Sequence, residues 1–352
     1  MKKIIAMAMA LIMTCALAAC GGSGTQATAA TATGDNAQQT TAAASSGEKI
    51  VIKLADVQAE NDVETLFEYK FAELVSEKSG GRIEVQVFPA GQMGEMADIL
   101  TSVQMGSIQM TRTNPSWLAD AGVGSINILA LPFIFKDLEH ANQVLDSDVG
   151  KQMLQEIEDK NIQVKGLGYL EPSGRYFFFK NKEVSSLADI KNLKIRVQTN
   201  SLATSMVEHL GASATPISYS ELYSSLQTGI VDGADNPLKG ILNMSFYEVG
   251  KYVLDMAHQY EASIIIMNTD FFNKLSAEDQ KILQEAMDEG AEYYKQIAEE
   301  ALDGYRTGLE EKGMVFVTPG DPQEWMDAVQ PMYADFSKGY EDVLQQVIDM
   351  QK

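Results

Sequence analysis

The side chains best suited to hold an organic acid are arginines, because a guanidinium grips a carboxylate with two parallel hydrogen bonds. The chain has few of them and meets most other basic needs with lysine; they are Arg82, Arg112, Arg175, Arg196 and Arg306. Arg175 stands between Gly174 and an aromatic run at 176–179, and Arg196 lies in an alternating run at 193–197. Both positions are typical of strands, so these two arginines are the candidate anion ligands.

The sequence lacks the motifs that would indicate catalysis. It has no G-x-S-x-G elbow, no phosphate-binding loop and no H-E-x-x-H pair. The histidines at 140, 209 and 258 are far apart, and both cysteines (Cys15 and Cys20) precede residue 21. We therefore expect no catalytic residues, no metal and no cofactor.

The charge of the chain limits its partners. It carries 49 acidic and 27 basic residues, a formal net charge of −22. Nucleic acid is excluded as a partner, because no basic face is available to neutralise phosphates. An acidic ligand would need a localised arginine site, which Arg175 and Arg196 would supply.

The stretch around Arg196 predicts a parallel α/β unit. A strand at 193–197 precedes a helix that ends at Gly211, and an apolar run to Ile217 precedes a helix at 220–228 that Gly229 closes. A brief strand at 230–231 then leads into a turn-rich loop at 232–237. In such sheets ligands gather beyond the carboxyl ends of the strands, here 196–198 and 232–236.

This stretch also resembles a known family. The runs K-I-R-V-Q (194–198) and L-G-A-S-A-T-P-I-S-Y-S-E-L-Y-S-S-L-Q-T-G-I-V-D-G-A-D-N (210–236) are similar to the signature of the DctP-like solute-binding proteins of tripartite ATP-independent periplasmic (TRAP) transporters. The resemblance implies that Arg196 holds the ligand carboxylate, that Tyr219 lines the pocket and that Asn236 contacts the ligand. It also implies that Arg175 faces the cleft as a second ligand.

The resemblance extends over most of the chain, from about residue 50 to about residue 283. It includes F-A-E-L-V-S-E-K-S-G-G-R-I-E-V-Q-V-F-P-A-G-Q-M-G-E (71–95) and L-P-F-I-F (131–135). It implies an α/β, two-lobed periplasmic-binding-protein-like fold with a long helix spanning both lobes, and helical pattern indeed runs from Leu275 to about Lys312. We expect 48–172 with 261–300 to form lobe I and 173–260 with 301–352 to form lobe II.

The ligand class follows from the same resemblance. The runs 111–115, 195–198 and 233–236 look most like members that bind sugar acids, notably galacturonate and glucuronate. We also expect Glu95, Asn114 and Gln198 in the site. Two positions depart from those members, which often have His where this chain has Gln58 and a second Asn where it has Pro237. A C4-dicarboxylate or a 2-oxo acid is the alternative ligand.

Each of these residues also has an ordinary structural interpretation. Arg175 would pack its stem on a neighbouring ring, and Arg196 would lie on a solvated strand face. Asn236 would be a turn residue before proline, and Tyr219 would fill the core. Their joint placement on one motif favours the binding interpretation.

The N-terminal residues are typical of an exported, anchored protein. Lys2 and Lys3 precede an apolar run at 4–17, which predicts a lipoprotein signal peptide at 1–20. The run 17–20 (L-A-A-C) resembles a lipoprotein cleavage box, so Cys20 would be lipidated; ordinary signal cleavage beside an incidental cysteine is the alternative. Residues 21–47 lack apolar bulk and predict a flexible tether.

The predicted function is an extracytoplasmic, membrane-anchored solute-binding lipoprotein that delivers a small organic acid to TRAP permease subunits. The family implies uptake driven by ion gradients and no enzymatic activity. An anchored hydrolase and a ligand sensor that docks on a receptor are the alternatives from other functional classes.

Overall fold

The computed structural model describes residues 49–351. Their strands form one mixed sheet, in which neighbouring strands follow the order β2-β1-β3-β9-β4-β7-β5-β6. Within this described part of the chain, no helix is both long and apolar enough to cross a membrane. Strands that are neighbours in the sheet come from distant parts of the sequence, so the sheet decides which polar side chains meet.

The first strand group lies at one end of this order. It consists of β1 (Ile50–Ala55), β2 (Ile83–Phe88) and β3 (Met110–Thr113), with β1 parallel to both neighbours. The connecting helices are α1 (Val63–Lys78) and α2 (Met96–Gln104). Helix α1 begins where the Asp62 side chain accepts a hydrogen bond from Glu64 N, and it buries Phe67 and Phe71.

The second strand group is the parallel unit that the sequence predicts. It consists of β5 (Lys194–Val197), β6 (Ser213–Pro216) and β7 (Gly233–Pro237), with β5 parallel to both neighbours. The connecting helices are α7 (Ser201–His209) and α8 (Leu222–Thr228). Asn200 caps the start of α7, and Gly229 ends α8 with φ 77°.

Two expectations about this unit are wrong. Residues 230–231, predicted as a brief strand, form none, because the strand begins later, at Gly233. Residues 232–237 have the composition of a loop, but Gly233–Pro237 form β7, which pairs with β5 on one side and with β4 (Val164–Phe179) on the other. Residue types that favour turns form a strand here because hydrogen bonds to β4 and β5 stabilise both edges of β7. Asp235 is tolerated there because a buried arginine pairs with it.

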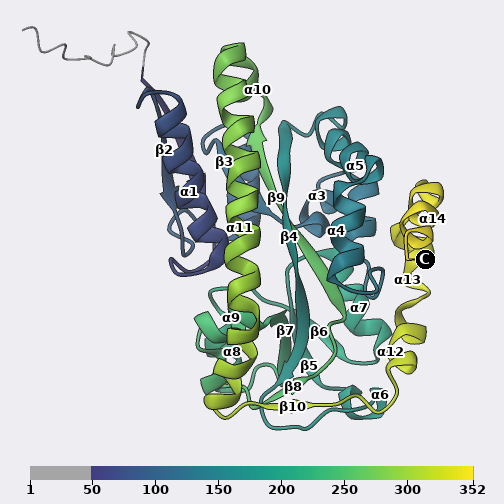
Figure 1. The fold of residues 1–352 in the computed structure, drawn as a ribbon. Helices are drawn as coiled ribbons and strands as arrows, with labels where there is room; N and C mark the ends of the chain where they lie inside the picture. The colour runs from purple at the N-terminus through teal and green to yellow at the C-terminus, as the bar shows by residue number, and fades with distance from the viewer. Residues whose placement is uncertain (1–48, 352) are drawn as a thin grey trace, which may run out of the picture. The chain divides into compact units, whose positions relative to one another are not determined.

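Two long strands and one long helix connect the groups. Strand β9 (Gln259–Asn268) pairs antiparallel with β3 and β4, and β4 pairs antiparallel with β7. Helix α11 (Ala277–Glu311, 35 residues) packs on α1 and on α9 (Leu238–Asn243), so it runs past both groups (Figure 1). This agrees with the α/β fold and the long helix expected from the sequence.

The remaining elements complete the outer layers. They are α3 (Pro115–Asp120), η1 (Ser125–Ala130), α4 (Leu138–Asp146), α5 (Asp148–Asp159), α6 (Leu187–Ile190), η2 (Phe246–Glu248), β8 (Tyr252–Leu254), α10 (Thr269–Lys274), β10 (Val315–Val317), α12 (Pro322–Val329), α13 (Met332–Phe336) and α14 (Glu341–Asp349). Helix α9 ends at Asn243; beyond it Ser245 adopts φ 56°, and Phe246 packs in the core against Phe178.

Candidate functional site

A cavity is lined by residues from both strand groups and from the strands that connect them. All residues predicted to form the site line it: Glu95, Asn114, Arg175, Arg196, Gln198, Tyr219 and Asn236. The lining also includes polar or aromatic residues that the sequence analysis did not single out as site residues: Glu64, Arg112, Trp117, Ser173, Ser218, Glu261 and Ser263.

The sheet register brings the predicted residues together. Strand β7 lies between β5 and β4, with Ala234 opposite Arg196 and Pro237 opposite Arg175. Asn236 is therefore flanked by the two arginine-bearing strands, although it lies far from both in the sequence. The Asn236 amide donates to the Tyr219 hydroxyl at 3.3 Å, which connects β7 to the segment before α8.

Arg196 is a buried cation without a carboxylate partner. Its side chain is 3% exposed, Nε donates to Ile217 O at 2.9 Å, and Cζ lies 5.9 Å from the centre of the Tyr219 ring. Within residues 49–351, nothing accepts a hydrogen bond from Nη1 or Nη2, and no carboxylate lies within ion-pair distance. Burial, together with the charge of Arg175, lowers the pKa of Arg196 to about 10, so it stays charged at neutral pH.

Arg175, by contrast, is already neutralised inside the protein. Its Nε donates to Asp235 Oδ2 at 2.7 Å, and Nη1 donates to Glu261 Oε2 at 2.8 Å. Although burial opposes ionisation, Arg175 and His258 hold the pKa of the Asp235 carboxyl well below its usual range. The Gln198 amide also lies against this guanidinium, with its oxygen 3.0 Å from Nη1 when turned toward it. Arg175 borders the cavity with its charge balanced by two carboxylates.

Arg112, on β3, is fixed in the same way. Nε and Nη2 donate to the two carboxylate oxygens of Asp56 at 2.7 and 2.8 Å, and Nη1 donates to Asn114 Oδ1 at 2.8 Å. Glu68 lies behind this pair, and burial and the Asp56 charge raise the pKa of Glu68 well above its usual range. Arg112 thus faces the cavity with its charge balanced by Asp56.

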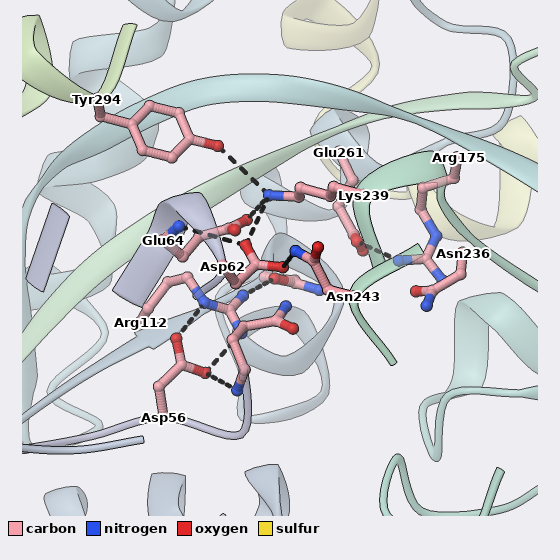
Figure 2. Close-up of polar contacts among 12 residues, drawn as sticks. Asp56, Asp62, Glu64, Arg112, Arg175, Asn236, Lys239, Asn243, Glu261 and Tyr294 are labelled. Carbon is pink, nitrogen blue, oxygen red and sulfur yellow. Dashed lines mark hydrogen bonds and ion pairs between the residues drawn. The ribbon is translucent and has the colours of Figure 1, made fainter. Parts of the chain in front are cut away.

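A cluster that the sequence analysis missed lies beside the cavity. We call it the Lys239 cluster, and its members are Asp62, Glu64, Lys239, Asn243 and Tyr294 (Figure 2). Lys239 Nζ is hydrogen-bonded to Glu64 Oε1, and it lies 3.7 Å from Asp62 Oδ1 and 3.5 Å from the Tyr294 hydroxyl. The cluster joins α1, α9 and α11, and Glu64 alone among its members lines the cavity.

Two polar contacts connect the first and second strand groups near the cavity. The Ser220 hydroxyl, before α8, donates to Glu95, which precedes α2. Asp120, the last residue of α3, accepts from the backbone N of Ser201 at 2.9 Å and from its hydroxyl. These contacts link the segments that carry α2 and α3 to those that carry α7 and α8. Across residues 49–351, no group of three or more His, Cys, Asp or Glu side chains is arranged to hold a metal ion.

Comparison with known proteins identifies the kind of site. The family model of bacterial extracellular solute-binding proteins, family 7 (DctP), matches residues 54–339. The chain belongs to this family. It is therefore an extracytoplasmic solute-binding protein of a TRAP transporter, as the sequence predicts, and not an enzyme, which sets the hydrolase alternative aside.

Solved structures of similar proteins contain sugar acids. A TRAP periplasmic solute-binding protein from Bradyrhizobium in complex with galacturonate superposes with TM-score 0.81 at 29% identity, covering 85% of this chain and 99% of that one. One from Roseobacter denitrificans with bound β-D-glucuronate gives TM-score 0.80 at 28% identity, covering 86% and 98%. These matches establish the two-lobed fold with its long helix.

A relative with another specificity is also similar. The C4-dicarboxylate-binding periplasmic protein DctP of Rhodobacter capsulatus is 28% identical to this family 7 protein over 294 residues, which is 83% of this chain and 87% of the relative. The family therefore includes members with different acid ligands, and the choice between them depends on the cavity of this chain.

Proposed function

We propose that this family 7 protein binds a sugar acid with one carboxylate, such as galacturonate or glucuronate. The observation that carries the proposal is the unpaired Arg196. Of the three arginines that line the cavity, Arg112 and Arg175 have carboxylate partners and Arg196 has none within the described chain. The cavity therefore offers one uncompensated cation, which suits one carboxylate.

The rest of the lining supports a ligand rich in hydroxyl groups. Sugar hydroxyls need both donors and acceptors, and the predicted site residues supply them: Glu95, Asn114, Gln198, Tyr219 and Asn236. Trp117 adds an apolar surface against which a sugar ring can pack. In this proposal Arg196 holds the carboxylate and Arg175 mainly positions its neighbours.

A C4-dicarboxylate is the alternative, because the Rhodobacter relative binds one. Two carboxylates would call for a second uncompensated cation, since a desolvated and unpaired ligand charge costs several kcal/mol. Among the described residues that line the cavity, no second cation without a carboxylate partner is present. A 2-oxo acid has one carboxylate but would leave most of the hydroxyl-binding groups unpaired.

Calorimetric titration of the purified protein with galacturonate, glucuronate, succinate and pyruvate tests the proposal. We expect one or both uronates to bind at least about tenfold more tightly than succinate or pyruvate, a difference of about 1.4 kcal/mol. Tightest binding of succinate would favour the dicarboxylate alternative and show that Arg196 alone does not set the charge of the ligand.

We further propose that the ligand is captured between two lobes that close around it before delivery to the permease subunits. Lobe I would comprise 48–172 with 261–300, and lobe II 173–260 with 301–352. The contacts between Glu95 and Ser220 and between Asp120 and Ser201 support closure, because each joins one proposed lobe to the other. Small-angle scattering should show a smaller radius of gyration with saturating uronate, and no compaction would contradict closure.

Anchoring by a lipid on Cys20 is also a proposal, because the signal peptide (1–20) and the tether (21–47) lie outside the described residues. Its support is the lipoprotein-like run that ends at Cys20. Two acyl chains suffice for stable membrane attachment. The mature protein should therefore partition with membranes, and Cys20→Ser should release it. A Cys20→Ser protein that is processed and still membrane-bound without detergent would contradict the anchor.

A further inference from the structure

We infer that Glu64 determines specificity in this cavity by accepting a hydrogen bond from a ligand hydroxyl and by rejecting a second carboxylate. The inference rests on the proposed function, because it concerns the same ligand. It assigns a role to a residue in the first turn of α1 that contacts the cavity from the first strand group, whereas Arg196 contacts it from the second.

The Glu64 carboxylate has acceptor capacity left. Its side chain is buried and lines the cavity, and Oε1 accepts from Lys239 Nζ. Among the described residues, no N–H group or hydroxyl donates to Oε2. The Asp62 carboxyl also hydrogen-bonds the Glu64 carboxylate. An ionised carboxylate has about four lone-pair sites, so about two remain for a donor in the cavity.

The Lys239 cluster keeps this carboxylate charged. Burial opposes ionisation, but Lys239, the Asp62 hydrogen bond and Arg112 outweigh it and lower the pKa of Glu64 to about 2. Burial and the charge of Glu64 together raise the pKa of Asp62 to about 8, so Asp62 is protonated at neutral pH and acts as a donor to Glu64. The cavity wall thus presents Oε2 of an ionised carboxylate, whose charge Lys239 balances and which no N–H group or hydroxyl of the described residues satisfies.

A fixed buried carboxylate treats the two ligand classes differently. A hydroxyl can donate to it and gains a charge-assisted hydrogen bond. A second ligand carboxylate at the same place has no proton to donate, so it would leave Glu64 Oε2 and its own oxygens facing each other as unpaired acceptors. Glu64 therefore favours hydroxy acids over dicarboxylates, which adds a repulsive element to the attraction supplied by Arg196.

Lys239 acts as a positioning residue. It does not line the cavity, and its contacts are with Glu64, Asp62 and Tyr294. Lys239 lies in α9, which directly follows β7 of the second strand group. The orientation of Glu64, in α1, therefore depends on an ammonium group from a distant part of the sequence. Its effect on ligand choice should pass through Glu64 alone.

Calorimetric titration of wild type, Glu64→Gln and Glu68→Gln with galacturonate, glucuronate and succinate tests the inference. Glu64→Gln keeps the size of the side chain and removes its charge. We expect about tenfold or more weaker uronate binding, while succinate binding stays unchanged or improves, so the uronate-to-succinate preference collapses. Glu68→Gln is the matched control, because it lies one turn later in α1, is buried and is absent from the cavity lining.

Lys239→Met and Lys239→Arg separate positioning from folding. Lys239→Met should lose the uronate preference and Lys239→Arg should restore part of it, whereas a merely structural role would lower the thermal midpoint without changing ligand preference. Equal losses for both ligand classes in Glu64→Gln, or wild-type binding of both, would overturn the inference. If wild type itself prefers succinate, the proposed function fails. If wild type prefers a uronate and Glu64→Gln keeps that preference, only the role of Glu64 fails.

Discussion

Arg175 and Asp235 form a buried ion pair across neighbouring strands, with 2.7 Å between Nε and Oδ2. Glu261, on β9, adds a second carboxylate at 2.8 Å from Nη1. The pair fixes β4, β7 and β9 where they border the cavity, so the charge of Arg175 is used inside the protein. Arg196 has no carboxylate partner among the described residues. We therefore assign Arg175 a structural role and Arg196 a ligand-binding role.

Arg175→Met should destabilise the fold strongly. Removing the cation leaves two buried carboxylates uncompensated, which typically costs about 3–5 kcal/mol. Urea unfolding should show the free energy of unfolding fall by that amount and the midpoint fall with it, and adding Asp235→Asn should recover part of the loss. Arg306→Met is the control, because its pair with Asp255 is partly exposed and should contribute about 1 kcal/mol or less. An Arg175→Met protein with the wild-type midpoint would show that the carboxylates are satisfied by other means.

Arg196→Ala should have the opposite profile. Loss of the cation should weaken uronate binding at least about thirtyfold, since an unpaired buried ligand charge costs roughly 2–5 kcal/mol. Arg196→Lys should recover only part, because an ammonium cannot make two parallel hydrogen bonds. Calorimetric titration measures this loss, and Arg306→Ala should bind as wild type does.

The ligand-free stability of Arg196→Ala gives a second readout. Burial disfavours the charged form of Arg196, as its lowered pKa indicates, so the unliganded protein should lose little stability without it. A variant that unfolds like wild type and binds uronate like wild type would refute the assignment of Arg196.

The sequence predicted the helices and strands that have clear local patterns, and it predicted the site residues that lie on the family motif. The strand of Arg196, the capped helix after it and the long helix are of this kind, because periodicity and caps are short-range properties. Arg196 and Asn236 are brought to one cavity by β7, whose central place in the sheet no local pattern reveals; hence residues 233–237 were predicted as a loop.

The Lys239 cluster was missed for a related reason. Asp62 before Val63 and Glu64 is a helix-start signal, but a polar first turn is equally typical of a solvated helix end and does not single out Glu64. The burial of Glu64 and Glu68 depends on cations that follow much later in the sequence, Lys239 and Arg112. Pairing between such distant residues is a property of the tertiary fold alone.

Asp62→Asn should change how stability depends on pH. The pKa of Asp62 is raised from 3.8 to about 8, by burial first and then by Glu64. Between these values the unfolded chain releases a proton that the folded protein keeps, so wild-type stability falls as pH rises from about 4 to about 8. Asparagine has no such proton and can still cap α1.

Urea unfolding at about pH 5 and about pH 8 checks this effect. The variant should gain on the order of 1 kcal/mol or more relative to wild type at the higher pH. Asp342→Asn, at an exposed position, should parallel wild type at both pH values. A constant difference between Asp62→Asn and wild type across this window would mean that Asp62 titrates normally in the folded state.

Asp120→Ala should speed ligand release without removing a ligand contact. Asp120 does not line the cavity, and it accepts from the backbone N and the hydroxyl of Ser201 at the start of α7. The contact is exposed and should contribute about 1 kcal/mol or less, so we expect dissociation of bound uronate to accelerate about two- to fivefold with little change in association. Stopped-flow measurement of tryptophan fluorescence can follow release, since Trp117 lines the cavity. Asp303→Ala, an exposed carboxylate on α11, is the control and should leave both rates unchanged. If Asp120→Ala slows association instead, the contact guides ligand entry and does not hold the closed state.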